Sequence, residues 1–299
     1  MAKLNQLRRE LRFNVEFLQL IQTLKNIAAS QYHMMEQEKE RFEEFMNAFA
    51  GFFRVVNLVD VDDPLVRSVS EVVGIVAVTS DSGFMGSLNA GVIATALGVQ
   101  GDRPDEAVEL FVIGEKGAGK LQELKRRFTF FQGLNEQTIY EQALEIGDHI
   151  VGKVLERRVG HVTLIYPRPI SFTQQTVEVV DVLPCAKLFR TAPGATTEEK
   201  TGGTGLAARA RGVIVESSFS DIVEYLATVW TVTKLYEVFE DSKLAEYSAR
   251  AMHLEESAQK LDKELKKLRH QCFRAAHEVV DKGMREAFSA RRKARRQAA

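Results

Sequence analysis

The sequence predicts an α/β protein, in which a long antiparallel coiled coil of the N- and C-terminal helices carries an inserted Rossmann-like α/β domain. Apolar residues recur every three or four positions at both ends of the chain, whereas the middle alternates short β-branched runs with amphipathic stretches. We place an N-terminal shaft helix at 1–59, the α/β domain at 60–190 and a flexible loop at 191–212. A C-terminal shaft helix at 213–299 completes the chain and pairs with 1–59.

The N-terminal segment carries the first apolar repeat. When the sequence is read in alternating steps of three and four from Leu4 to Val56, only Asn14, Lys25 and Lys39 are polar. A seam held over about seven heptads is typical of a coiled coil. A continuous helix of this length spans roughly 80 Å at about 1.5 Å per residue. Such a helix needs another helix along most of its length.

The C-terminal segment supplies the second repeat, and its alanines would let a facing helix approach closely. Its positions are Tyr247, Ala251, Leu254, Ala258, Leu261, Leu265, Leu268, Cys272, Ala275 and Val279. We expect this helix to begin near Ser218 or Ser220, because serine favours helix starts and Asp221 suits the first turn. A heptad repeat can also mediate dimerisation, but two matched repeats at opposite ends of one chain favour pairing within the chain.

The middle of the chain predicts a small sheet with helices between its strands. Buried parallel strands are predicted at Val72–Thr79, Val108–Ile113 and Val162–Tyr166, and Phe172–Leu183 alternates like an edge strand. The amphipathic stretches are 87–99, 116–127 and 136–158.

A glycine turn after the second predicted strand mimics a phosphate-binding loop. Residues Gly114 to Lys120 satisfy the G-x-x-x-x-G-K part of the P-loop, but Leu121 stands where that motif needs Ser or Thr to hold magnesium. A strand-to-helix turn is therefore the favoured interpretation, and a P-loop NTPase is the weaker alternative.

No other pattern predicts a catalytic, cofactor or metal site. The turn T-S-D-S-G-F-M-G-S-L-N could cradle an anion at a helix N-terminus, but Asp81 would repel a phosphate. The histidines form no H-E-x-x-H motif or Cys/His cluster, and no G-x-S-x-G elbow occurs. The net charge of −1 gives no indication of nucleic-acid binding; the basic run at 291–296 is a local exception.

Taken together, these features resemble the gamma subunit of F-type ATP synthases. That family carries an S-D-R-G-L-C-G-G-L-N run after its first central strand and an I-G-x-K-G turn after its second. The matching residues here are Asp81, Gly83, Gly86 and Asn89 in the first turn, and Gly114, Lys116 and Gly117 in the second. The second match explains the glycine turn better than a P-loop does.

The end helices extend the resemblance. Lys25 fits the family's A-M-K-x-V-A-A run, and Glu246 and Arg250 fit its S-E-x-x-A-R-M run. The sequence also departs from the family, because F-N-V-E-F-L-Q-L-I-Q replaces a basic N-terminal stretch. In addition, the family's R-Q-A-x-I-T-x-E run has no clean counterpart around 274–285.

The resemblance implies a non-catalytic rotor shaft that couples ion flow through a membrane ring to ATP synthesis or hydrolysis in a catalytic headpiece. The implied partners are a hexameric ring of alpha and beta nucleotide-binding subunits, an epsilon-type subunit and the membrane ring of c subunits. The protein would work on the cytoplasmic side of the bacterial plasma membrane, touching the membrane only through the complex. Candidate rotor-interface residues are Lys25, Glu246, Arg250, Arg291, Arg292, Arg295 and Arg296. A coiled-coil adaptor that dimerises through its end helices is the alternative.

Overall fold

The computed structural model describes residues 2–53, 63–185 and 219–297, which form two compact units. The helix-pair unit comprises Met1–Ala28 and Ala251–Ala299, and the α/β unit comprises Ala29–Arg250. The boundaries predicted near residues 59, 190 and 212, and the loop predicted at 191–212, lie outside the described residues.

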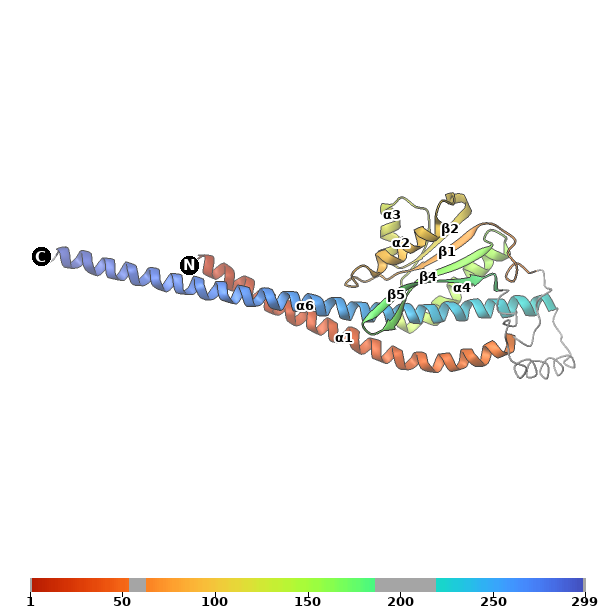
Figure 1. Cartoon of the computed structure of the whole chain (residues 1–299), viewed down its shortest axis with the longest axis horizontal. Coiled ribbons are helices and arrows are strands. Elements are labelled where there is room, and N and C mark those ends of the chain that lie inside the picture. The colour runs from red at the N-terminus through yellow and green to blue at the C-terminus, as the bar shows by residue number, and fades with distance from the viewer. Residues whose placement is uncertain (1, 54–62, 186–218, 298–299) are drawn as a thin grey trace. The chain divides into compact units, whose positions relative to one another are not determined.

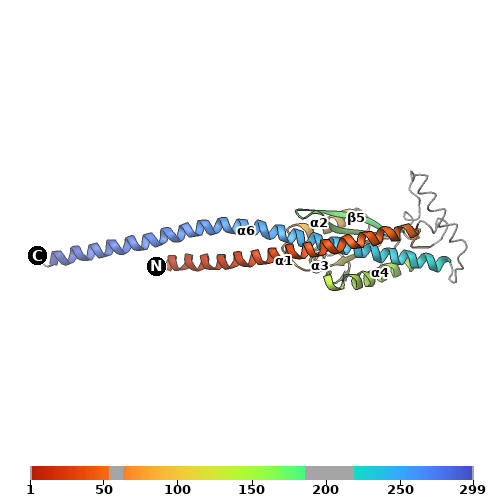
Figure 2. The ribbon, with the colours of Figure 1, turned by 90° about the horizontal axis from the view of Figure 1, so that it is seen from below.

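The helix-pair unit is built from the ends of two long helices, α1 (Ala2–Phe53) and α6 (Phe219–Gln297). The helices lie side by side and run in opposite directions within this unit (Figure 2). Ile21 packs into one apolar cluster with Leu254 and Leu265. The predicted antiparallel pairing is therefore confirmed. The start predicted near Ser218 or Ser220 falls at the edge of the described residues, which resume at Phe219.

The buried side of each helix in this unit follows the predicted heptads. The buried seam residues of the unit are Leu4, Ile21 and Ala28 on α1, with Ala251, Leu254, Ala258, Leu261, Leu265, Leu268 and Ala275 on α6. Bulky and small side chains alternate along these seams, so the two helices can approach closely and fill the space between them.

The α/β unit contains a five-stranded sheet in the order β3-β2-β1-β4-β5. The strands are β1 (Val73–Val78), β2 (Val108–Ile113), β3 (Thr129–Phe131), β4 (His161–Ser171) and β5 (Gln174–Leu183). The first four pair in parallel, and β5 pairs antiparallel to β4 at the edge. The Rossmann-like expectation is confirmed, whereas β3 was missed because a strand this short shows no periodicity.

The helices cover both faces of this sheet (Figure 1). Helices α2 (Leu88–Gln100) and α3 (Glu115–Glu123) pack on one face, and α4 (Ile139–Leu155) and α6 pack on the other. Single 3-10 turns, η1 (Asp105–Ala107) and η2 (Glu136–Thr138), precede β2 and α4. Successive residues of β1 alternate between the two cores, as expected for a strand covered on both faces.

The first part of helix α6, up to Arg250, belongs to the α/β unit and covers one face of its sheet. Its Leu235, Val238 and Phe239 are buried in the core between the sheet and α4. Gly147 on α4 allows this close approach, because a Cβ there would lie 2.7 Å from a methyl group of Val232. The same helix thus contributes to the core of each unit.

The predicted helices at 116–127 and 136–158 are too long at their ends. Helix α3 ends at Glu123, and Lys125 follows with a positive φ of 54°. Helix α4 ends at Leu155, and Arg157 has a φ of 59°. Lys125 and Arg157 therefore adopt the left-handed backbone conformation that ends a helix. Neither residue type predicts this conformation from the sequence.

Replacing Leu265 by alanine tests the seam of the helix pair. Leu265 is buried among apolar side chains of both helices, so we expect the substitution to cost about 2–5 kcal/mol of unfolding free energy. Thermal melting of the helical circular-dichroism signal measures this loss. Glu264→Ala, at the exposed neighbouring position, is the matched control and should change little. If the two variants had the same melting temperature, the burial of Leu265 between the two helices would be contradicted.

Candidate functional site

The glycine turn after β2 is occupied by the protein's own carboxylate. Asp81 Oδ1 accepts a hydrogen bond of 2.8 Å from the backbone N–H of Glu115, in the first turn of α3. This is the place where a P-loop would hold a phosphate. Lys116 is exposed, and the Lys120 ammonium pairs with Glu123 at 2.8 Å. The backbone N–H of Glu115 is therefore bonded to the protein's own Asp81, and the turn does not form a phosphate-binding loop.

The glycines of this turn are required by close packing. Gly114 has a φ of 95°, and a Cβ there would lie 2.4 Å from the carbonyl oxygen of Thr79. A Cβ on Gly117 would lie 2.5 Å from Thr79 Oγ1. That hydroxyl accepts from the Gly117 N–H at 3.0 Å and donates to the Ile113 carbonyl at 2.7 Å. Thr79 thus fixes the start of α3 against the end of β1.

Asp81 links the ends of neighbouring strands. Besides its bond to α3, the Asp81 carboxylate packs closely against Gly133. A Cβ added to Gly133 would lie 2.3 Å from the carboxyl atoms of Asp81. Gly133 follows β3, whose Phe131 carbonyl accepts a hydrogen bond of 3.0 Å from the Gly114 N–H. The loops after β1, β2 and β3 are therefore held together at one edge of the sheet.

Asn89 closes the remaining part of the same edge. Its Oδ1 accepts from the Ser80 N–H at 3.2 Å, and its Nδ2 donates to Ser80 Oγ at 2.9 Å. The strand order reverses between β1 and β4, which is where open α/β sheets usually bind ligands. Here Asn89 uses its side chain to hold the loop after β1. Gly86 supplies a φ of 57° in that loop, whereas a Cβ on Gly83 would meet nothing within 4 Å.

A second cluster of polar groups joins α6 to the α/β fold, and we call it the polar junction. It comprises Glu136, Arg168, Gln175, Asp241, Lys243, Glu246, Tyr247, Ser248 and Arg250. Tyr247 Oη donates to the Glu136 carboxylate at 2.9 Å, and Gln175 Nε2 donates to Ser248 Oγ at 2.9 Å. These bonds tie η2 and β5 to the same stretch of α6.

Charges within the polar junction are paired although the junction is largely buried. The Glu246 carboxylate lies between the Lys243 ammonium, at 3.0 Å, and the guanidinium of Arg250. Both cations also lie over the ring of Tyr247, at 5.0 and 6.0 Å from its centroid. Burial, followed by the hydrogen bond to Glu136, raises the pKa of Tyr247, so this hydroxyl remains a donor.

The structure therefore places the predicted interface residues in different settings. Glu246 and Arg250 are brought together and contact the chain itself. Lys25 is half-buried in the helix-pair unit and pairs with Glu255 at 2.9 Å. Hydrogen bonds from Gln259 and from Lys25 hold the pKa of Glu255 below its usual value. Arg291 is exposed on α6, whereas the side chains of Arg292, Arg295 and Arg296 lie outside the described residues.

Sequence reasoning missed most of the polar junction. The heptad pattern places Tyr247 on the apolar seam alone, and Glu136, Arg168 and Gln175 lie far from it in sequence. The one signal available was the run of polar residues from Glu240 to Lys243 on a helix with an apolar seam, because charges buried on a helix need partners.

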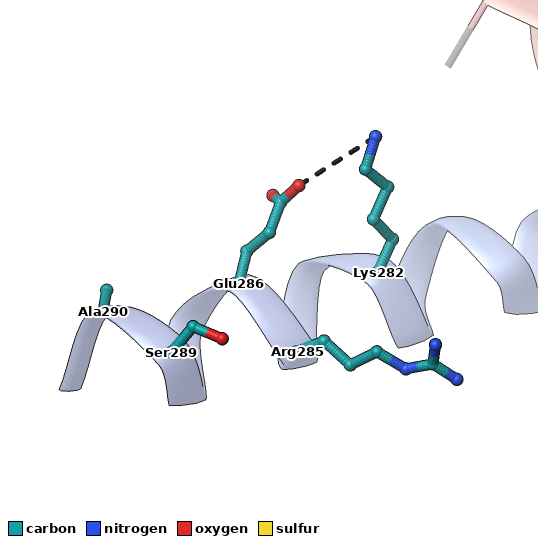
Figure 3. Close-up of a pocket in the computed structure, with 5 residues that line it drawn as sticks. All are labelled: Lys282, Arg285, Glu286, Ser289 and Ala290. Carbon is teal, nitrogen blue, oxygen red and sulfur yellow. Dashed lines mark ion pairs between the residues drawn. The ribbon is translucent and has the colours of Figure 1, made fainter. Parts of the chain in front are cut away.

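The described residues offer no ligand site comparable to these structural clusters. A shallow hollow near the end of α6 is lined by Lys282, Arg285, Glu286, Ser289 and Ala290 (Figure 3). All of these side chains come from one helix, and Lys282 pairs with Glu286 at 4.0 Å. Within the ranges that the structure describes, no three His, Cys, Asp or Glu side chains gather to hold a metal ion. Nor is any described helix long and apolar enough to cross a membrane.

Comparison with known proteins identifies the family. The sequence model described as ATP synthase matches residues 3–290. The chain belongs to the ATP synthase family. It is 27% identical over 230 residues to the ATP synthase gamma chain of Desulforudis audaxviator, covering 75% of each protein. It is 22% identical over 296 residues to that of an Exiguobacterium species, covering 96% of this chain and 97% of the relative.

Solved structures show the same fold. A chain of the Euglena gracilis mitochondrial ATP synthase, in an OSCP/F1/c-ring structure, matches with a TM-score of 0.69 and 14% identity. That match covers 97% of this chain and 93% of the other. A chain from the central stalk and c-ring of the Tetrahymena thermophila enzyme matches with a TM-score of 0.55 and 18% identity, covering 80% of this chain. The bacterial relatives are gamma chains, which confirms the predicted resemblance to a gamma subunit.

Substitution of two glycines on α3 tests the close packing of Gly117 against Thr79. Gly117→Ala would force Thr79 to move, so we expect it to cost about 1–3 kcal/mol of unfolding free energy. Gly119→Ala is the control, because a Cβ there meets nothing within 4 Å and alanine favours a helix by up to about 1 kcal/mol. Chemical denaturation measures both. Equal effects of the two substitutions would contradict the packing role of Gly117.

The two cysteines should differ in reactivity. Cys185 is buried, its thiol donates to the Leu65 carbonyl at 3.2 Å, and burial raises its pKa to about 12. Cys272 is half-buried on α6. Because the thiolate is the reactive form, iodoacetamide at pH 8 should label Cys272 faster by roughly tenfold or more. Peptide mass spectrometry measures the rates. In denaturant the difference should vanish, and its persistence there would argue against burial as the cause.

Proposed function

We propose that this chain is the central shaft of a rotary ATP synthase or ATPase, coupling ion flow through a membrane ring to nucleotide chemistry on other subunits. Membership of the ATP synthase family is the observation that carries this proposal. The helix pair agrees with it, since a shaft has to present an extended surface to the subunits around it. The occupied glycine turn agrees as well, because nucleotide chemistry then belongs to the partners.

The partners follow from the same proposal. A hexameric ring of alpha and beta subunits would surround the helix pair, while an epsilon-type subunit and the ring of c subunits would contact the α/β unit. The matching chain from Euglena gracilis belongs to a structure described as OSCP/F1/c-ring, which supports an assembly of this kind. The bacterial gamma chains among the relatives favour the cytoplasmic side of a bacterial plasma membrane.

The candidate interface residues take separate roles in this proposal. Arg291 is exposed at the end of α6 and begins the basic run 291–296, which would meet acidic side chains or carbonyl groups of the ring. Lys25 lies on the helix pair and could exchange Glu255 for a partner carboxylate. Glu246 and Arg250 would act indirectly, by holding the polar junction through which force passes between the α/β unit and α6.

Reconstitution with defined subunits tests the proposal. The chain, mixed with alpha and beta subunits from the same source, should form a complex with one copy of this chain per hexamer. Size-exclusion chromatography with mass analysis measures the composition, and ATP hydrolysis should depend on the chain's presence. A variant that lacks residues 291–299 should assemble more weakly if the basic end contacts the ring. A stable homodimer in sedimentation, with no affinity for the ring subunits, would instead establish the coiled-coil adaptor.

A further inference from the structure

The hairpin formed by β4 and β5 extends beyond the rest of the sheet, and we call residues 166–178 the hairpin arm. Strand β4 pairs with β1 from His161 to Ile165, whereas its pairing with β5 continues as far as Ser171 and Gln174. Among the strands that the structure describes, the arm thus consists of two strands paired with each other alone. A two-stranded hairpin is at most marginally stable in water, so the arm needs support from other elements. Helices α1 and α6 give this support.

The hairpin arm contacts α6 through polar side chains. Gln175 Nε2 donates to Ser248 Oγ at 2.9 Å, and the guanidinium of Arg168 lies 3.7 Å from the buried carboxylate of Asp241. Ser248 Oγ donates its only proton to the Ala245 carbonyl at 3.1 Å, so toward the arm it can act only as an acceptor. The contact with Ser248 therefore requires the N–H donor that the amide of Gln175 supplies.

The tip of the hairpin arm contacts α1 through aromatic rings. Phe172 meets the ring of Tyr32 edge to face, with centroids 5.0 Å apart, and stacks on His33 at 5.9 Å. Tyr32 Oη donates to the Glu36 carboxylate at 3.1 Å, which fixes the orientation of its ring. Among the described side chains of α1 in the α/β unit, Tyr32 and Met35 are the buried ones, and both belong to the core against which Phe172 packs. Phe172 thus contacts α1 at the place where this helix is anchored.

One short hairpin therefore joins two helices that lie far apart in the sequence. Apolar packing alone allows a helix to rotate about its own axis more readily than directional contacts do. Hydrogen bonds and ring contacts are directional, so the bond of Gln175 and the rings around Phe172 oppose such a rotation. The arm is thus suited to hold both helices at a fixed angle to the sheet.

We infer that the hairpin arm transmits torque between the sheet of the α/β unit and both helices, with Phe172 and Gln175 as positioning residues. This inference rests on the proposed function, because a shaft works only if its sheet and its helices turn together. Loss of either contact would let a helix slip against the sheet under load, so that ATP is hydrolysed without a full turn of the membrane ring. The effect should fall on the coupling of hydrolysis to ion transport, since the nucleotide sites belong to other subunits.

Two matched pairs of variants test the arm in the complete membrane complex. Gln175→Glu keeps the size of the side chain but removes the N–H donor, and Gln174→Glu adds the same charge at the exposed neighbouring position. Phe172→Ala removes the ring at the tip, and Ile170→Ala shortens a side chain on the same arm that is 61% exposed. In inverted vesicles, a voltage-sensitive dye measures the initial rate at which membrane potential forms, whichever ion is carried. Divided by the rate of ATP hydrolysis, this rate should fall about twofold or more in Gln175→Glu and Phe172→Ala and stay at the wild-type value in both controls.

The outcomes separate the inference from the proposed function. If the ratio is the same in the wild type and all four variants, the arm inference is wrong and the shaft function stands. If the wild type does not assemble with the alpha and beta ring, the proposed function itself fails. A melting temperature of Gln175→Glu equal to that of the wild type is expected, and a loss of ATP hydrolysis as large as the loss of the ratio would show a merely structural role and overturn the inference. If Phe172→Ala does not fold, the two glutamine variants decide the question by themselves, because they leave the apolar core unchanged.

Discussion

Burial of the long apolar seam of α6 is the constraint on which the rest of the structure depends. A helix of 79 residues cannot cover its own apolar side, so the apolar seam up to Ala275 is buried against other elements. In the helix-pair unit α1 supplies the cover, and in the α/β unit the sheet and α4 supply it. The α/β fold therefore uses as its covering helix an element that also forms half of the pair. This sharing explains why a sheet of modest size has a well-covered second face.

Polar groups fix what apolar packing alone leaves variable. Apolar contacts tolerate sliding along a helix, whereas the hydrogen bonds of Tyr247 and Ser248 set the position of α6 along its axis. At the edge of the sheet, Asp81, Thr79 and Asn89 similarly fix the loops against one another. Both clusters contain side chains of types that catalyse reactions or bind ligands in other proteins. Here these side chains form hydrogen bonds within the chain itself.

The elements with strong periodicity were predictable from the sequence, because burial on one side of a helix or both sides of a strand leaves a repeating pattern. The seams, the β1 and β2 strands and the glycine turn follow from such local signals. The β3 strand and the stop of α3 at Lys125 do not, since one is too short and the other depends on a backbone conformation. The polar junction joins residues more than a hundred positions apart, as in the pair of Glu136 and Tyr247, and no local pattern reports that contact.

The ion pair between Lys25 and Glu255 joins positions 230 residues apart, which has a consequence for biosynthesis. Ribosomal synthesis proceeds from the N-terminus, so α1 is complete long before residue 251 exists. Throughout that interval the apolar seam of α1 has no intramolecular partner and is open to association with other nascent chains. The pairing of α1 with α6 therefore has to follow synthesis of the C-terminal helix, and its contacts are among those farthest apart in the sequence.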